Sequence, residues 1–164
     1  MRTLVVALVV AVLLLPDHAT AQEGELPFSQ GRFRVSVNGG TTFGGGGFGL
    51  GAGFGYYVID GLELGIDGNI FLGSKVLQGS LAPSVRYLLP YLYPVVPYLG
   101  VFYRHTFIEK PWDDQDHLGG RVGLLISIDN RFMLGGGLVM EYALTGCTSE
   151  CLDYYPELTI NFTF

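Results

Sequence analysis

The chain has few charged residues and very little lysine. Charged residues make up 15% of its 164 residues, and the two lysines are Lys75 and Lys110. With a net charge of −6, the sequence supplies no basic patch for nucleic acid. A soluble protein with a fully hydrated surface normally carries many lysines and glutamates. The composition therefore excludes a nucleic-acid-binding protein and disfavours a fully hydrated outer surface.

The sequence also lacks the motifs of common ligand sites. The glycine-rich stretch 39–47 has no Gly-Lys-Ser/Thr ending, so it is not a phosphate-binding loop. The charged loop predicted at residues 108–118 could offer oxygen ligands to a divalent cation, but it lacks the Asp-x-Asp-x-Asp-Gly spacing of a calcium loop. We interpret it as a solvated loop, since like charges usually stay in water, and we expect no cofactor. The weak candidate ligands in it are Asp113, Asp114, Asp116 and His117.

One long apolar run occurs, at residues 4–15, with Arg2 before it. It has about a dozen residues, whereas a helix needs roughly 20 to cross a membrane. Ala19-Thr20-Ala21 has the small-x-small form of a signal-peptidase site. We therefore predict that residues 1–21 are a cleaved signal peptide. Export makes oxidation of the two cysteines feasible.

Beyond residue 30 the main pattern is an alternation of apolar and polar residues. A period of two predicts β-strands that each have one apolar face. Pro90–Pro97 contains three prolines, so we predict a turn and no strand there. In the segment at about 46–57, glycines fill nearly the whole polar face, which leaves room inside a narrow barrel. The alternating segments are about 31–39, 46–57, 62–73, 80–89, 98–107, 119–128, 132–144 and 154–164.

The last segment alternates most strictly and ends on an aromatic residue. Its apolar face comprises Leu158, Ile160, Phe162 and Phe164. This pattern resembles the small outer-membrane β-barrels of Gram-negative bacteria, especially the eight-stranded OmpA and OmpX type. The resemblance implies an all-β, eight-stranded antiparallel up-and-down transmembrane β-barrel over residues 31–164. Residues 22–30 would form a periplasmic lead-in.

The same resemblance implies a cellular location and partners. In that family the C-terminal pattern is read by the β-barrel assembly machinery, so the four apolar residues of the last segment would be the assembly signal. The expected location is the outer membrane, and the expected partners are its lipid and lipopolysaccharide. We expect a monomer.

The polar faces of the segments carry a nearly balanced set of ions. A soluble lipocalin-like barrel would turn its apolar face inward, and many lysines and glutamates would then cover its outside. A small balanced set suits an enclosed lumen, so we predict that the apolar face meets lipid. Strand direction puts Arg104, Arg121, Glu141 and Glu157 in the outer half of the lumen, and we expect ion pairs to close it. The set predicted for the inner half is Arg32, Arg34, Glu63, Asp67 and Arg86.

Two cysteines, Cys147 and Cys151, fall in the last outer loop. The three intervening residues allow the usual separation of the Cα atoms in a disulfide if the loop turns back on itself. We predict that the two residues form a disulfide.

Enzymatic activity is the alternative to a structural role, because some small outer-membrane barrels modify lipopolysaccharide. An acyl hydrolase needs a serine that a nearby histidine activates. His105 is followed by Thr106 and Phe107, with no serine near it along the strand. The leading hypothesis is therefore a non-enzymatic barrel with a structural or surface-interaction role in the envelope. A lipid A-modifying enzyme or a cation-binding surface barrel remains the alternative.

Overall fold

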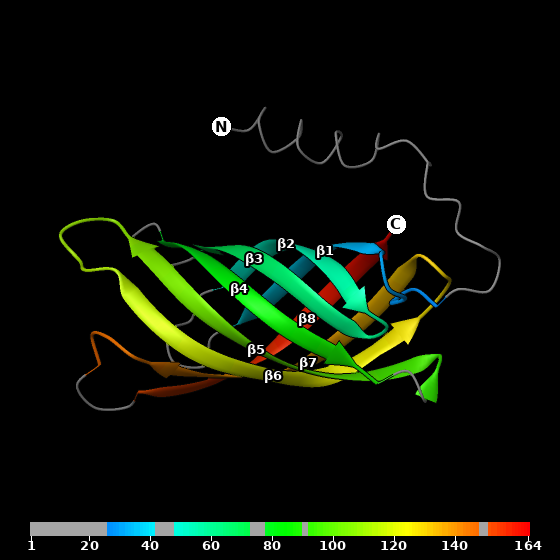
Figure 1. The fold of residues 1–164 in the computed structure, drawn as a ribbon. Helices are drawn as coiled ribbons and strands as arrows, with labels where there is room; N and C mark the ends of the chain where they lie inside the picture. Colours follow the sequence, from blue (N-terminus) through cyan, green and yellow to red (C-terminus); the bar gives the residue numbers. More distant parts are fainter. Residues whose placement is uncertain (1–25, 42–47, 73–77, 90–91, 148–150) are drawn as a thin grey trace.

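Eight antiparallel strands form one closed barrel (Figure 1). The computed structural model describes residues 26–41, 48–72, 78–89, 92–147 and 151–164. Each strand pairs with the next along the chain, as in an up-and-down meander. The strands are β1 Phe33–Thr41, β2 Phe48–Ile59, β3 Leu62–Leu72, β4 Gln78–Leu88, β5 Val95–Ile108, β6 Gln115–Ser127, β7 Phe132–Ala143 and β8 Leu152–Thr163.

The barrel closes where β1 meets β8. Val35 pairs with Phe162 and Val37 with Ile160. At the end of this seam, the backbone N–H of Phe33 donates to the carbonyl oxygen of Phe164 at 3.0 Å, and the reverse bond measures 2.9 Å. A closed barrel leaves no strand edge unpaired. The predicted eight-stranded antiparallel barrel is thus confirmed.

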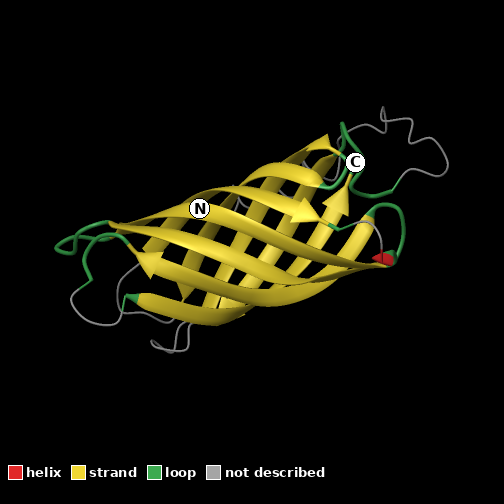
Figure 2. Ribbon diagram, turned by 60° about the horizontal axis from the view of Figure 1, so that its bottom comes forward, coloured by secondary structure: helices red, strands yellow, loops and turns green. Residues whose placement is uncertain are grey.

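The strands run obliquely around the barrel (Figure 2). Segment Leu26–Arg32, the β2–β3 turn and the C-terminus lie at one end, which we call the inner end (Figure 1). The opposite end is the outer end. In the described part of the chain no helix is long and apolar enough to cross a membrane.

Two strands, β5 and β6, begin three or four residues earlier than the sequence predicts. β5 starts at Val95 and includes Pro97, so the prediction of a turn through residue 97 is wrong. Pro97 stands near the start of the strand, where a missing N–H removes little of the ladder, and its carbonyl accepts from Leu89 N–H at 2.8 Å. β6 starts at Gln115, because four residues of the predicted charged loop pair with β5.

Neighbouring residues on a strand face opposite sides of the wall. On β1, Phe33 is 45% exposed while Arg34 is 2% exposed. Apolar side chains are likewise exposed on all the other strands, for example Phe54, Ile66, Val85, Val101, Val122, Leu138 and Ile160. The polar and charged side chains of the opposite face are buried inside the barrel. The barrel therefore has an apolar outer surface and an interior that contains its ionic groups.

The interior is not polar throughout. At the inner end, apolar and aromatic side chains from five strands pack together with Phe28, which precedes β1. We call this group the inner apolar cluster: Phe28, Tyr57, Leu88, Val96, Tyr98, Leu125 and Met133, each at most 1% exposed. The polar lead-in expected at residues 22–30 thus places a buried phenylalanine inside the barrel.

Glycines on the inner face make room for large side chains. A Cβ atom added at Gly119 would overlap the ring of Phe102, whereas the nearest atom to one added at the neighbouring Gly120 is a backbone oxygen at 3.7 Å. Gly119 therefore allows Phe102 to occupy the interior.

We predict that Gly119→Ala lowers the free energy of unfolding by about 1 to 3 kcal/mol, because Phe102 must shift in a packed interior. Gly120→Ala is the matched control and should change stability little. Urea unfolding of the two variants in lipid vesicles measures the difference. Equal stability of the two variants would show that Phe102 does not need the space above Gly119.

Candidate functional site

The interior ionic groups are the candidate functional site, and they begin directly above the inner apolar cluster. Glu63, from the start of β3, lies between two arginines. Its Oε1 is 2.8 Å from Arg34 Nε and its Oε2 is 2.6 Å from Arg86 Nη2. All three side chains are nearly inaccessible to solvent. The Arg86 guanidinium also lies 5.4 Å from the centre of the Tyr98 ring, so the ion pairs rest on the apolar cluster.

Asp67 connects this inner group to the outer half of the lumen. Its carboxylate oxygens lie 3.5 Å from Arg34 Nη2 and 3.1 Å from Arg121 Nη2. Arg121 in turn is 3.6 Å from Glu157. Strand direction alone assigns Asp67 and Arg121 to different halves. In the structure they meet, so six groups form one connected chain along the barrel.

A second group lies towards the outer end. Arg104 forms an ion pair with Glu141 and donates to the Tyr155 hydroxyl at 2.8 Å, while Tyr155 donates to Glu141. Phe102 lies between two guanidinium groups, with its ring centre 5.1 Å from Arg104 Cζ and 4.6 Å from Arg121 Cζ. Such contacts stabilise a cation against an aromatic face. The ring links the two ionic groups of the lumen.

Phe102 and Tyr155 are absent from the sequence-predicted site. Alternation places both on the inward face, and this was the available signal. Arg32, which the prediction included, lies at the inner end. There its Nη1 donates to the carbonyl of Leu26 at 3.2 Å.

A cavity of about 30 Å³ lies in the outer half of the lumen. Asn38, Asn69, Arg104, Tyr155 and Glu157 line it. A volume of this size holds about two water molecules. The outer part of the lumen can therefore be hydrated locally while the inner end is filled by side chains.

His105 and Thr106, the candidate residues for an acyl hydrolase, point to opposite sides of the wall. His105 faces outward, where its Nδ1 lies 2.7 Å from Asp116 Oδ1, and its neighbour Thr106 is buried inside the barrel. Asp116 also accepts from the Tyr103 hydroxyl at 2.5 Å. His105 and Thr106, which are adjacent in the sequence, therefore lie on opposite sides of the wall.

The candidate cation loop does not converge on one point. Asp116 faces outward with His105, whereas the next residue, His117, lies on the inward face of β6 with Arg121. Asp113 and Asp114 are exposed before the strand begins, and Asp114 Oδ2 lies 3.8 Å from Nε2 of His105. Among the described residues there is no group of three or more histidine, cysteine or acidic side chains that could hold a metal ion.

Residues of the predicted assembly signal lie along β8. Leu158, Ile160 and Phe162 are exposed on the outer face, and the Phe162 ring packs 5.2 Å from the Phe132 ring of β7. Phe164 follows the strand and pairs with Phe33 across the seam. The C-terminal residues thus complete the wall of the barrel.

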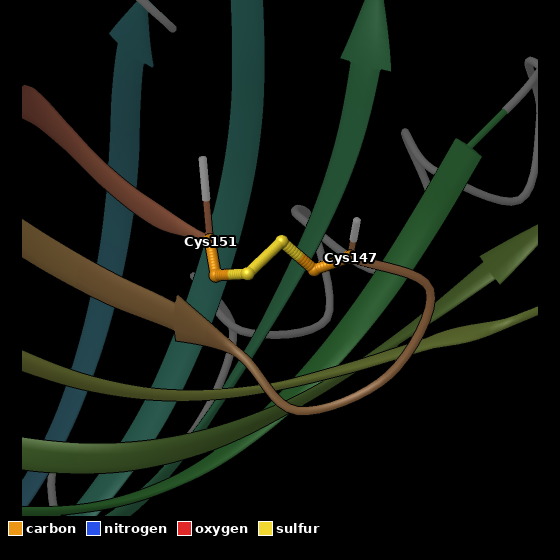
Figure 3. Close-up of a disulfide and its surroundings, with 2 residues drawn as sticks. All are labelled: Cys147 and Cys151. Carbon is orange, nitrogen blue, oxygen red and sulfur yellow. A yellow bond between two sulfur atoms is a disulfide. The ribbon is translucent and has the colours of Figure 1, made fainter. Parts of the chain in front are cut away.

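Cys147 and Cys151 form a disulfide between the end of β7 and the start of β8 (Figure 3). Their Cα atoms are 5.5 Å apart, within the usual range. The bridge closes a ring with a sequence separation of 4. So short a ring removes less entropy from the unfolded chain than a longer ring would.

We predict that the double variant Cys147→Ser, Cys151→Ser lowers the free energy of unfolding by no more than about 2 kcal/mol, with the effect confined to the outer loop. Thiol titration of the native protein purified without reductant should find no free thiol. Two free thiols, or a large loss of barrel stability in the double variant, would contradict the prediction.

Solved structures of outer-membrane barrels share this fold. The N-terminal β-barrel domain of Pseudomonas aeruginosa OprF aligns with a TM-score of 0.67 at 18% identity, over 82% of this chain and 98% of that domain. Neisserial surface protein A aligns with a TM-score of 0.52 at 18% identity, over 80% of this chain and 93% of that protein. The Yersinia pestis protein Ail aligns with a TM-score of 0.52 at 10% identity, over 82% of this chain and 100% of that protein. No protein-family model and no curated protein sequence matches.

These similarities concern the fold. At such low identity they do not transfer the function of any one neighbour to this chain. They do show that the architecture predicted by the alternation is that of known eight-stranded outer-membrane barrels.

Proposed function

We propose that this chain is an integral outer-membrane β-barrel protein with a closed lumen and a structural or surface-interaction role in the cell envelope. The observation that carries the proposal is the contrast between the two faces of the wall. Exposed apolar side chains cover the outside, while the ionic side chains are buried and paired inside. A soluble protein rarely exposes so extensive an apolar surface, whereas transmembrane barrels require one.

A closed lumen is supported by what fills the interior. Eight strands enclose a space just wide enough for side chains. Here the connected chain of ion pairs occupies that space, and the inner apolar cluster fills the end below it. Because buried arginines and carboxylates are costly to separate, the pairs favour a filled interior over a water-filled channel. The proposed role is therefore not that of a general porin.

The lipid-facing surface can be tested with a charge. Val122 is 60% exposed and lies in the middle of β6. We predict that Val122→Lys destabilises the membrane-inserted barrel by about 2 to 4 kcal/mol, as expected for a lysine near the bilayer midplane. Unfolding in lipid vesicles and recovery in the outer-membrane fraction measure the effect.

Trp112→Lys is the control, because Trp112 is equally accessible, at 63%, but lies in the outer loop. It should insert and unfold like the native protein. If Val122→Lys were as stable as the control, the outer surface would be in water and the membrane proposal would be wrong.

A lipid A-modifying enzyme is the second candidate. The outward His105 and Asp116, 2.7 Å apart, have the arrangement of a general base and the carboxylate that orients it. Among the described residues no hydrogen bond joins His105 to a serine or threonine. We expect the lipid A mass spectrum to be the same with and without the protein. An acyl-chain change that requires His105 would favour the enzyme.

A further inference from the structure

The segment before β1 folds back into the inner mouth of the barrel. Pro27 and Phe28 are buried there, and Ser29 N–H donates to the carbonyl of Leu26 at 3.1 Å, which forms a turn. This turn directs the Phe28 side chain into the barrel. There it packs against the inner apolar cluster, which five different strands supply.

Hydrogen bonds attach this segment to the wall, in addition to the bond from Arg32 Nη1 to the carbonyl of Leu26. The carbonyl of Phe28 accepts from Gly61 N–H at 2.9 Å, and Gly31 N–H donates to the backbone carbonyl of Tyr57 at 2.8 Å. Gln30 N–H donates to the Asp60 carboxylate at 2.7 Å. These bonds reach the end of β2 and the β2–β3 turn. They are additional to the ladder between β1 and β8, which closes the barrel by itself.

The position of Phe28 also decides what it shields. The cluster to which it belongs includes Tyr98, and the guanidinium of Arg86 lies on the Tyr98 ring. Phe28 thus lies below the Glu63 ion pairs, between them and the inner mouth. Water that entered from that mouth would meet Phe28 before it reached the ionic chain. Burial of the Phe28 ring stabilises the segment in the mouth, together with the buried Pro27 and with Leu26, which packs against the cluster.

We propose that residues 26–31 are a removable stopper that keeps water and solutes from the inner side out of the lumen. This inference rests on the proposed membrane barrel with a closed lumen. It adds that the closure has a part that can leave without opening the wall. With the stopper displaced, the inner mouth becomes a water-accessible vestibule floored by Tyr98, Met133 and the other cluster residues.

A single thiol behind the stopper tests the proposal. Met133→Cys places it in the cluster, at a site that is 0% exposed, while the native cysteines are joined in a disulfide and do not react. The probe is a small water-soluble methanethiosulfonate, applied to the full chain folded in lipid vesicles. With Phe28 present, labelling should be slow. With Phe28→Ala added, labelling should be at least about tenfold faster, because the packed ring is gone.

Two further variants complete the experiment. Phe33→Ala removes the phenylalanine that begins β1, whose side chain faces outward. It should therefore leave the thiol protected. Asp60→Ala removes the exposed acceptor of the Gln30 N–H bond and leaves the cluster intact. It should speed labelling about threefold, as expected for one lost hydrogen bond. If Phe28→Ala does not fold, Asp60→Ala tests the proposal in its place.

The outcomes separate the two proposals. If the thiol stays equally protected in Phe28→Ala and Asp60→Ala, the stopper is wrong while the closed lumen stands. If the thiol reacts fast with Phe28 in place, the inner end is open in the native protein, and the closed lumen falls together with the stopper.

Discussion

Replacing Glu63 by alanine is expected to lower the free energy of unfolding by about 3 to 5 kcal/mol, the usual cost of removing one partner from a buried ion pair. Glu63 is 1% exposed and contacts both Arg34 and Arg86. Its removal leaves two buried guanidinium groups without their shared carboxylate. Arg34 keeps its longer contact with Asp67, at 3.5 Å, and its hydrogen bonds to Ser36 and Asn161, none of which replaces the close carboxylate.

Urea unfolding and refolding in lipid vesicles would measure this loss. Glu63→Gln should fall between the native protein and the alanine variant, because the amide still accepts hydrogen bonds but carries no charge. Glu109→Ala is the control, since Glu109 is exposed in an outer loop and a surface substitution usually changes stability by less than about 0.5 kcal/mol. Glu63→Ala with the stability of Glu109→Ala would mean that the lumen charges are hydrated.

Replacing Phe164 by aspartate, or deleting it, is expected to remove most of the protein from the outer membrane. Phe164 exchanges two backbone hydrogen bonds with Phe33 at the seam that closes the barrel. We propose in addition that Phe164 belongs to the assembly signal that the resemblance to outer-membrane barrels implies. The chain should accumulate as periplasmic aggregate or degraded material, which fractionation and immunoblotting would measure.

Phe164→Tyr keeps the aromatic ring and should insert normally. Folding into vesicles without the assembly machinery separates the two roles of Phe164. A deletion that folds well in vesicles but fails in cells would identify a recognition defect, whereas failure in both would identify the seam. Normal insertion of Phe164→Asp in cells would show that the terminal residue is not required.

Alternation in the sequence predicts which face of the wall each residue occupies. Arg34 follows the outward Phe33, and Glu63 precedes the outward Leu64, so their inward positions follow from a period of two. The same rule predicts the strand number, because each change of direction is marked by glycine, proline or a charged loop. It does not define strand ends well, since pairing can continue into polar and charged residues such as His117 and Asp116.

Contacts across the lumen could not be predicted from the sequence. Arg121 on β6 meets Asp67 on β3, two strands that are not neighbours in the barrel. Their meeting depends on the reach of an arginine side chain and on the stagger of the strands. Phe28 is a similar case, because the lead-in has no periodic pattern. Its burial depends on a gap that side chains from five strands leave at the inner mouth.

Single-channel recording in planar lipid bilayers tests the central claim, a membrane barrel with a filled lumen, most directly. The native protein would be folded in lipid, inserted into the bilayer and recorded in potassium chloride over a range of voltages. The ion pairs around Glu63 and Asp67 and the stopper below them predict silence or small, brief openings. Large, steady, porin-like conductance from the native protein would contradict the account.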